Sequence, residues 1–223
     1  MCIRDSLSSA LTFNKYTCKT FLKQHQVLTP EARLVKKDME ADLEEISDIV
    51  GIPCFVKPNN GGSSFGTTRV MKFEHLEQAI ETALKEDGEV IIERYIKGTE
   101  VTCGLMKTKD GFTVFPITEI VTDNEFFDYE AKYTRGKANE ITPARLDEDM
   151  TKKCQQAASL IYDLTFSSGI VRVDFIIKGN QLYFLELNSI PGMTAESIVP
   201  QQVECMGVPM EVIFQQVIDN AML

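Results

Sequence analysis

The chain has 223 residues, of which 43% are hydrophobic and 25% are charged, so it has enough apolar material for one large domain or two small ones. The formal net charge of -10 argues against nucleic acid or a membrane surface as a main partner, because acidic surfaces repel phosphate groups. No apolar run reaches the length of a membrane span or resembles the core of a signal peptide. Six widely spaced cysteines without a C-x-x-C pair argue against a zinc site or a disulfide framework, so we expect reduced thiols in a cytoplasmic protein.

The first six residues are interpreted separately from the rest. Residues 1–6 read Met-Cys-Ile-Arg-Asp-Ser, which can be back-translated to the end of a transposon adapter used to prepare sequencing libraries. We therefore expect an artefact at residues 1–6 and genuine protein sequence from about Leu7, with an ordinary N-terminus as the alternative.

From Leu7 onward, apolar periodicity and turn residues predict two α+β units, residues 7–96 and residues 97–223. Neither shows the regular alternation of a doubly wound parallel sheet. Residues 123–143 are polar and aperiodic, which predicts a functional loop that orders when a ligand binds. The predicted elements, in chain order, are helix 14–26, strand 30–35, helix 41–50, strands 54–57 and 68–73, helix 74–85, strands 89–96, 101–107 and 112–121, helix 147–164, strands 170–177 and 182–187, and helices 198–206 and 210–221.

A lysine at the end of a strand is followed by a loop rich in glycine and serine. Lys57 ends the run Phe55-Val56-Lys57, and residues 59–66 contain three glycines and two serines. Glycines let backbone N–H groups approach a polyphosphate closely. Because the loop leads into a strand and not into a helix, it is no P-loop. It is typical of a flexible cover over ATP, although a solvent-exposed hairpin would have a similar composition.

Two later strands carry polar residues within apolar runs. Arg172 and Asp174 are two residues apart and share one strand face, as do Glu186 and Asn188 on the next strand. Across a hairpin these faces can coincide and collect oxygen ligands of the kind that Mg²⁺ prefers. The alternative is an exposed face with cross-strand salt bridges. Gly192 follows the second of these strands, and its backbone N–H could point into the site and form an oxyanion hole. The alternative is an ordinary Pro-Gly turn.

Together these segments resemble the D-alanine–D-alanine ligases, a family of the ATP-grasp superfamily whose fold is α+β with two lobes clasping the nucleotide. The resemblance covers the chain from Leu7 to its C-terminus, and several spaced motifs in one order are more specific than any single motif. The matching segments are Lys57 with its loop and residues 92–95, 129–133, 172–174, 186–188, 191–194 and 197–200.

The resemblance implies a role for each matching residue. ATP would contact Lys15, Lys57, Ser64, Glu93, Tyr95, Ile96, Glu100 and Lys132. Two Mg²⁺ ions, with Mn²⁺ as an alternative, would be bound by Asp174, Glu186 and Asn188. The catalytic residues would be Arg172, Gly192, Ser63 and Tyr133, and the carboxylate of the second D-alanine would be positioned by Ser197 and Ile198.

The reaction implied by the resemblance joins two D-alanines through an acyl phosphate and supplies peptidoglycan synthesis. The resemblance also makes a homodimer a candidate assembly of the intact protein. In this family an N-terminal domain precedes the region that matches Leu7 and supplies a glutamate for the first D-alanine. We therefore expect this chain alone to have little turnover. The alternatives are another ATP-grasp carboxylate–amine ligase, such as the D-alanine–D-lactate type, and a non-catalytic fragment that binds nucleotide.

Overall fold

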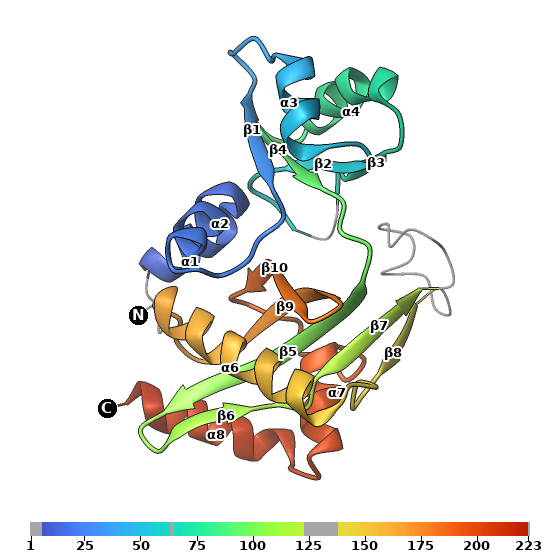
Figure 1. Ribbon diagram of the computed structural model, residues 1–223. Coiled ribbons are helices and arrows are strands. Elements are labelled where there is room, and N and C mark those ends of the chain that lie inside the picture. The colour runs from blue at the N-terminus through green and yellow to red at the C-terminus, as the bar shows by residue number, and fades with distance from the viewer. Residues whose placement is uncertain (1–5, 63–64, 123–137, 223) are drawn as a thin grey trace.

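The computed structural model describes residues 6–62, 65–122 and 138–222, which form two antiparallel sheets with helices packed on them (Figure 1). The expected α+β class is thereby confirmed. The smaller sheet has the order β1-β4-β2-β3, from β1 (Ala32–Lys36), β2 (Cys54–Pro58), β3 (Thr68–Val70) and β4 (Glu89–Arg94). The larger has the order β10-β9-β5-β7-β8 with β6 beside β5, from β5 (Thr99–Thr108), β6 (Gly111–Val114), β7 (Thr118–Thr122), β8 (Ala138–Ile141), β9 (Val171–Lys178) and β10 (Gln181–Asn188).

The helices α3 (Leu43–Val50) and α4 (Leu76–Ala83), with the short 3₁₀ helix η1 (Phe73–His75), belong to the smaller sheet. The side chain of Asp42 caps α3 by accepting from the backbone N–H of Glu45 at 2.9 Å. In β2, Cys54, Val56 and Pro58 are buried, whereas Phe55 and Lys57 alternate with them and are only half-buried. This alternation directs Phe55 and Lys57 to the face of the sheet away from its core.

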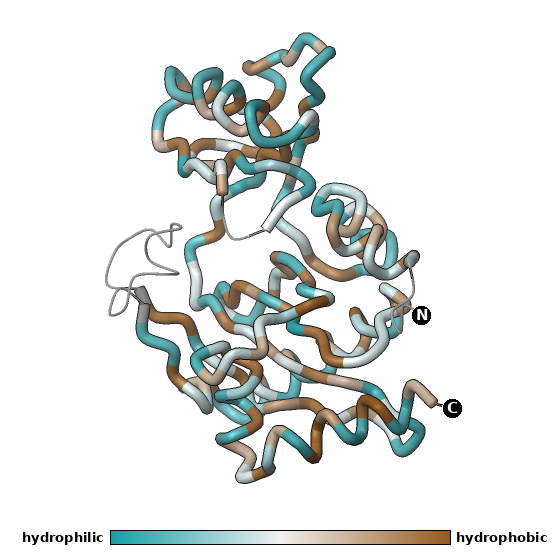
Figure 2. Tube along the Cα trace, turned by 180° about the vertical axis from the view of Figure 1, so that it is seen from behind, coloured by the Kyte–Doolittle hydropathy of each residue, from teal (hydrophilic) through white to brown (hydrophobic). Residues whose placement is uncertain are grey.

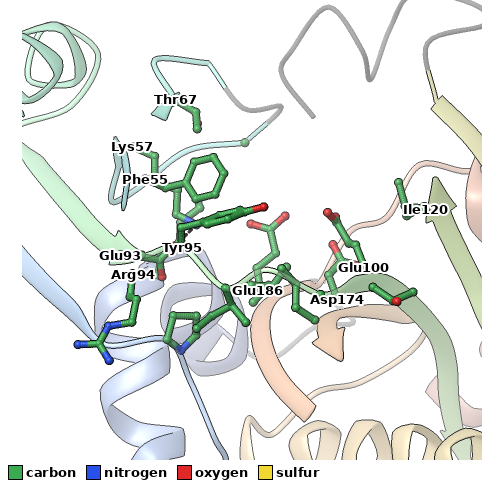
Figure 3. A pocket seen from close by; sticks show the side chains of 18 of the residues that line it. Phe55, Lys57, Thr67, Glu93, Arg94, Tyr95, Glu100, Ile120, Asp174 and Glu186 are labelled. Carbon is green, nitrogen blue, oxygen red and sulfur yellow. Dashed lines mark ion pairs between the residues drawn. The ribbon is translucent and has the colours of Figure 1, made fainter. Parts of the chain in front are cut away.

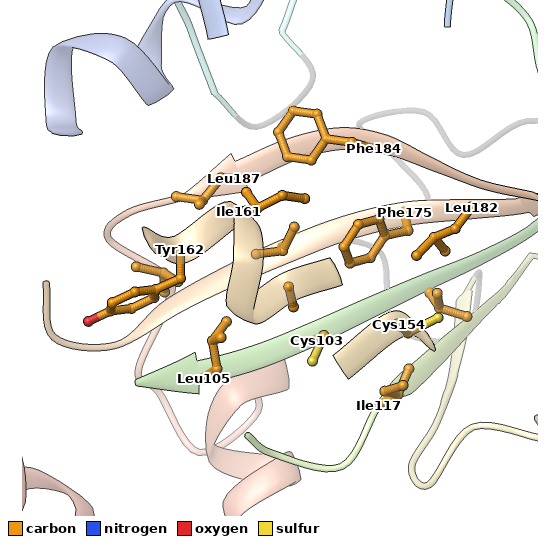
Figure 4. Close-up of a cluster of buried hydrophobic side chains, with 14 of the residues drawn as sticks. Cys103, Leu105, Ile117, Cys154, Ile161, Tyr162, Phe175, Leu182, Phe184 and Leu187 are labelled. Carbon is orange, nitrogen blue, oxygen red and sulfur yellow. The ribbon is translucent and has the colours of Figure 1, made fainter. Parts of the chain in front are cut away.

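The larger sheet is packed on both faces. Helix α6 (Glu148–Leu164) shares one core with β5, β9 and β10, in which aromatic and aliphatic side chains interlock (Figure 4). The helices α7 (Ile198–Cys205) and α8 (Met210–Ala221) share the other core with Met106 of β5. Neighbouring Leu105 belongs to the first core, because successive side chains of a strand point to opposite faces. Hydrophobic and hydrophilic stretches alternate along the chain in both halves of the molecule when it is seen from behind (Figure 2).

The N-terminal helices link the two halves of the molecule. Helix α2 (Lys15–Gln24) follows α1 (Ser6–Phe13) and is capped by Asn14, whose side chain accepts from the backbone N–H of Thr17. Helix α2 contacts both β1 and β10, and its Cys18 and Leu22 are buried in the core of the larger sheet. The division into residues 7–96 and 97–223 stays a proposal, and this packing shows that α2 does not belong to the smaller sheet alone.

Most predicted elements are present, with four differences. Helix α1 was not predicted, and the predicted strand 68–73 ends at Val70. The β-rich segment 112–121 is two strands, β6 and β7, because its ends pair with different parts of β5. Residues 138–141, predicted as loop, form β8 through pairing with β7. In the described part of the chain, no helix is long and apolar enough to cross a membrane.

Candidate functional site

A pocket of about 430 Å³ lies between the two sheets, beside the segment that joins β4 to β5 (Figure 3). Both lobes line it, and two of the predicted metal ligands, Asp174 and Glu186, form part of its wall on the larger sheet. The structure also brings six of the residues predicted to contact ATP to this pocket, namely Lys15, Lys57, Glu93, Tyr95, Ile96 and Glu100.

A cluster of three charged residues, Lys19, Lys57 and Glu93, is here called the buried triad, and two of them, Lys57 and Glu93, line the pocket. Lys57 and Glu93 are diagonal neighbours on one face of the β2–β4 ladder, in which Lys57 pairs with Ile91 and Phe55 with Glu93. The carboxylate of Glu93 forms ion pairs with the ammonium groups of both lysines. The side chains of Lys19 and Glu93 are 3% and 5% exposed, so water contributes little to their solvation.

Burial and charge act against each other in this triad. Burial alone would raise the pKa of Glu93, but Lys19 and Lys57 outweigh it and lower the pKa to about 2. Burial acts to lower the pKa of Lys57, but the attraction of Glu93 and Glu186 outweighs it, so the pKa is raised. For Lys19, burial outweighs the attraction of Glu93 and lowers the pKa to about 8. At neutral pH the triad therefore has two ammonium groups and one carboxylate.

The adjoining wall is aromatic and apolar. The rings of Phe55 and Tyr95 lie 5.8 Å apart between centroids, and both line the pocket with the buried Ile96. The guanidinium carbon of Arg69 lies 4.3 Å from the centre of the Tyr95 ring, a cation–π arrangement that orients the ring. A flat apolar wall of this kind can accept a planar heteroaromatic group.

The start of α2 is bonded to the beginning of the glycine- and serine-rich loop. The Lys15 ammonium group donates to the carbonyl oxygen of Gly61 at 2.5 Å, and the Lys15 backbone N–H donates to the carbonyl oxygen of Asn59. The buried Asn59 side chain accepts from the backbone N–H of Tyr16 and donates to Glu89. Two predicted cations, Lys15 and Lys57, thus line the pocket from different elements.

The opposite wall has an acidic and polar cluster on β9 and β10. Glu186 pairs with Asp174 across the hairpin, and Asn188 pairs with Arg172, because an irregularity between Phe184 and Glu186 shifts the register. The Arg172 guanidinium donates two bonds of 2.9 Å to the Asp174 carboxylate. Burial acts to lower the pKa of Arg172, but the attraction of Asp174 outweighs it and raises the pKa. The predicted coincidence of the two strand faces is therefore present.

The composition of this cluster fits a hard divalent cation. Asn188 lies 3.2 Å from Asp174 and 3.5 Å from Glu186, measured from its amide nitrogen to a carboxylate oxygen of each. The Thr102 hydroxyl donates to Asp174 at 2.5 Å. Carboxylate and amide groups without nitrogen or sulfur ligands suit Mg²⁺ that is completed by phosphate oxygens. Within the described ranges, no group of three His, Cys, Asp or Glu side chains is arranged to hold a metal ion.

The remaining predicted residues lie beyond β10 or outside the described residues. Ser197 precedes α7, and its hydroxyl lies 2.9 Å from that of Thr194. Gly192 lies against Ser197, since a Cβ on Gly192 would be 2.7 Å from the Ser197 hydroxyl oxygen. Five predicted residues within the described ranges do not line the pocket, namely Arg172, Asn188, Gly192, Ser197 and Ile198. Ser63, Ser64, Lys132 and Tyr133 lie outside the described residues.

Sequence reasoning missed several residues of this site. Lys19 follows Lys15 by four residues on a predicted helix, and this spacing was the available signal that both could face one side. Thr102 and Gln202 are polar residues within apolar elements, and no local pattern marks their partners. Gln202 is fully buried and bonds α7 to the backbone of β5.

The protein-family model described as D-ala D-ala ligase C-terminus matches residues 21–219. Among curated proteins, the chain is 48% identical over 215 residues to a D-alanine–D-alanine ligase of Phocaeicola vulgatus and 46% identical to one of Bacteroides fragilis. Each alignment covers 96% of this chain and 66% of the relative. The chain therefore spans just under two thirds of the length of these relatives.

Solved structures with the same fold include a D-Ala:D-Ser ligase, VanG, from Enterococcus faecalis, with a TM-score of 0.87 and 34% identity over 98% of this chain and 64% of that one. A D-alanine–D-alanine ligase from Bacillus anthracis has a TM-score of 0.84 and 30% identity, covering 98% and 69%. A structure of the B. anthracis enzyme complexed with ATP matches with a TM-score of 0.84 and 28% identity, covering 98% of this chain and 68% of that one.

Proposed function

We propose that this chain, which belongs to the D-alanine–D-alanine ligase family and has the ATP-grasp fold, binds ATP between its two sheets as part of a protein that ligates D-alanine to D-alanine. The observation that carries the proposal is the opposition of charges across one pocket. Lys15 and Lys57 line it from one side, and Asp174 and Glu186 line it from the other. A polyphosphate with bound cations is the kind of ligand that such an arrangement accepts.

The pocket suggests how the nucleotide lies. The adenine base would lie against Phe55, Tyr95 and Ile96, where the wall is aromatic and apolar. Glu100, the second residue of β5, lines the pocket and would accept from the ribose hydroxyls. The phosphates would then extend toward Lys15 and Lys57, the two lysines that line the same pocket.

Asp174, Glu186 and Asn188 would bind the magnesium that accompanies ATP, and bound Mg²⁺ supplies charge neutralisation for the phosphates. The bonds of Arg172 and Thr102 to Asp174 orient that carboxylate before any cation arrives. A fixed ligand loses less conformational freedom when the cation is bound. The same residues accommodate Mn²⁺, which also takes oxygen ligands.

In the proposed reaction the carboxylate of the first D-alanine attacks the γ-phosphate of ATP, giving an acyl phosphate and ADP. The amine of the second D-alanine then attacks the acyl carbon, and phosphate leaves. Arg172 and the backbone N–H of Gly192 would stabilise the oxyanion of the tetrahedral intermediate. Ser197 and Ile198, at the start of α7, would position the second carboxylate, since the first N–H groups of a helix have no partner within it.

The wider assignments are proposals for the whole protein. The product would serve peptidoglycan synthesis, and through it cell wall formation and cell shape, in the cytoplasm. The substrate would be D-alanine, and a homodimer is the proposed assembly. Ser63, Ser64, Lys132 and Tyr133 keep their proposed roles at the phosphates and the reacting centre.

The first test measures nucleotide binding by this chain with Mg²⁺ by calorimetry. We expect ATP to bind and Lys57→Met to weaken binding by more than about tenfold, because a buried cation would be lost from the phosphate site. Lys72→Met is the matched control, since Lys72 is an exposed lysine of the same lobe. Unchanged affinity of the Lys57 variant would remove the phosphate site from this wall.

The second test measures phosphate release that depends on the amino acid. The chain and a fusion carrying the remaining N-terminal part of the Phocaeicola vulgatus relative would be assayed with D-alanine, D-serine and D-lactate. We expect turnover of the fusion with D-alanine alone and little turnover of the unextended chain. Preference for D-alanine with D-serine would assign the chain to the activity named for the E. faecalis structure. Preference for D-alanine with D-lactate would assign it to the depsipeptide-forming type.

A further inference from the structure

The buried triad contains one lysine with no proposed contact to the nucleotide. Lys57 and Glu93 line the pocket, whereas Lys19 does not belong to the described residues that line it. Lys19 lies on α2, and its ammonium group is bonded to Oε1 of the Glu93 carboxylate, whereas Lys57 is paired with Oε2. The Lys19 side chain is 3% exposed, although a lysine is seldom fully buried.

A buried ammonium group destabilises the fold unless an opposite charge lies beside it. One lysine paired with one glutamate would be enough to balance the charge. Here Glu93 has two lysine partners, so the triad as a group has one more positive than negative charge. The excess positive charge faces the pocket, because Lys57 is the lysine of the triad that lines the pocket. In a buried environment that charge is screened less than it would be in water.

We propose that Lys19 is a positioning residue for the phosphate site: it neutralises Glu93, so that Lys57 presents a full positive charge to a phosphate of the nucleotide. Without Lys19, the Glu93 carboxylate would have Lys57 as its sole lysine partner in the triad. The two would form a neutral pair, and the attraction of phosphate from this side of the pocket would fall mainly to Lys15. The inference rests on the proposed nucleotide site, and it assigns Lys19 and the Glu93 carboxylate a role in setting the charge of that site.

The triad also links the phosphate site to the core of the larger sheet. Cys18 and Leu22, on either side of Lys19 in α2, are buried in that core. The ion pair between Lys19 and Glu93 therefore connects β4 of the smaller sheet to α2, a helix whose apolar residues pack on the larger sheet. Arginine at this position would keep the charge but has a different shape, so it separates charge from packing.

The test measures affinity for ATP, ADP and adenosine with Mg²⁺ by calorimetry, and folding by circular dichroism and thermal unfolding. Lys19→Met is expected to lower ATP affinity by about tenfold while changing adenosine affinity less than about twofold. The reason is that the substitution changes the charge of the site that attracts the phosphates, and adenosine has no phosphate. Lys23→Met is the matched control, since Lys23 is an exposed lysine of the same helix, paired with Glu31 at the surface. It is expected to bind ATP like the unmodified chain.

The double variant Lys19→Met with Glu93→Gln decides between charge and structure. Removing both charges leaves Lys57 without its carboxylate partner and restores one net positive charge, so most of the lost ATP affinity should return. A purely structural role of Lys19 predicts a further loss in the double variant. If Lys19→Met fails to fold, the double variant and Lys19→Arg carry the test, and both are expected to fold and to bind ATP more tightly than adenosine.

The outcomes separate this inference from the function on which it rests. If the unmodified chain binds neither ATP nor adenosine, the proposed nucleotide site is wrong. If it binds ATP and Lys19→Met binds ATP equally well, or if the double variant shows no recovery, the nucleotide site stands and the role of Lys19 is overturned. Equal losses for ATP and adenosine would also overturn it, because a weaker attraction for phosphate should not change the affinity for a nucleoside that has none.

Discussion

Replacing Gln202 by methionine should destabilise the protein far more than the same change at an exposed glutamine. Gln202 is fully buried on α7, and its side chain makes three hydrogen bonds to the larger sheet. Its amide oxygen accepts from the Gly104 N–H at 3.1 Å, and its amide nitrogen donates to the Thr102 carbonyl at 3.0 Å and to the Thr118 hydroxyl at 3.1 Å. Methionine fills nearly the same space but makes none of these bonds.

The magnitude follows from what each partner loses. The Gly104 N–H would be left without its acceptor, which costs about 1–3 kcal/mol for a buried donor. The Thr102 carbonyl and the Thr118 hydroxyl would each lose one bond, at about 0.5–1.5 kcal/mol, and Thr118 keeps its bond of 2.7 Å to Thr142. We therefore expect a loss of about 2–6 kcal/mol, a large share of the roughly 5–15 kcal/mol that holds a typical domain folded.

Urea unfolding followed by circular dichroism measures this loss as a lower midpoint with an unchanged slope. Gln215→Met is the matched control, because Gln215 is exposed on α8 and bonds only within its helix, to Asp219. It should change the unfolding free energy by less than about 0.5 kcal/mol. A loss below about 1 kcal/mol for Gln202→Met would refute the reasoning, since the partners would then be satisfied without the glutamine.

Three further predictions concern the pocket. Glu186→Gln should weaken Mg²⁺-ATP binding by more than about tenfold in calorimetry while leaving the thermal midpoint nearly unchanged, because Glu186 lines the pocket as a proposed ligand; equal affinities would remove it as a ligand. The Glu93 carboxylate has a folded pKa of about 2 against an ordinary 4.5, so it stabilises the fold above pH 4.5 and this contribution is lost as the pH falls through 2. The unfolding free energy of the unmodified chain minus that of Glu93→Gln should therefore shrink over this range, and a constant difference would contradict the assignment. Gly98→Ala should lower stability by about 1–3 kcal/mol in urea unfolding, since its Cβ would lie 2.2 Å from the carbonyl oxygen of Ile177; a neutral effect would show that the joining segment yields easily.

The sequence by itself determined the features that depend on short spacing along the chain. Arg172 and Asp174 share a strand face because side chains alternate, and their hairpin partners Glu186 and Asn188 follow within reach of one turn. The same holds for Lys57, which precedes the glycine- and serine-rich loop. These positions follow from strand geometry, so a single sequence was sufficient to predict their neighbourhood.

Elements without such local signals were misjudged. Residues 138–141 have little periodicity and become strand β8 only because β7 offers a partner. The break between β6 and β7 has the same origin, since each pairs with a different part of β5. Strand formation depends on the neighbour across the sheet as much as on intrinsic propensity, and the neighbour is distant in sequence.

Only the tertiary structure decided which charges meet. Lys19 and Glu93 are 74 residues apart, and Gln202 bonds Gly104 across 98 residues. A lysine in an amphipathic helix and a glutamine in another are ordinarily exposed. The spacing of Lys19 from Lys15 could place both on one helix face, but no local pattern marks Lys19 or Gln202 as buried. They are buried because α2 packs between the two sheets and α7 packs on β5, where a partner of complementary charge or hydrogen-bonding capacity offsets the loss of water.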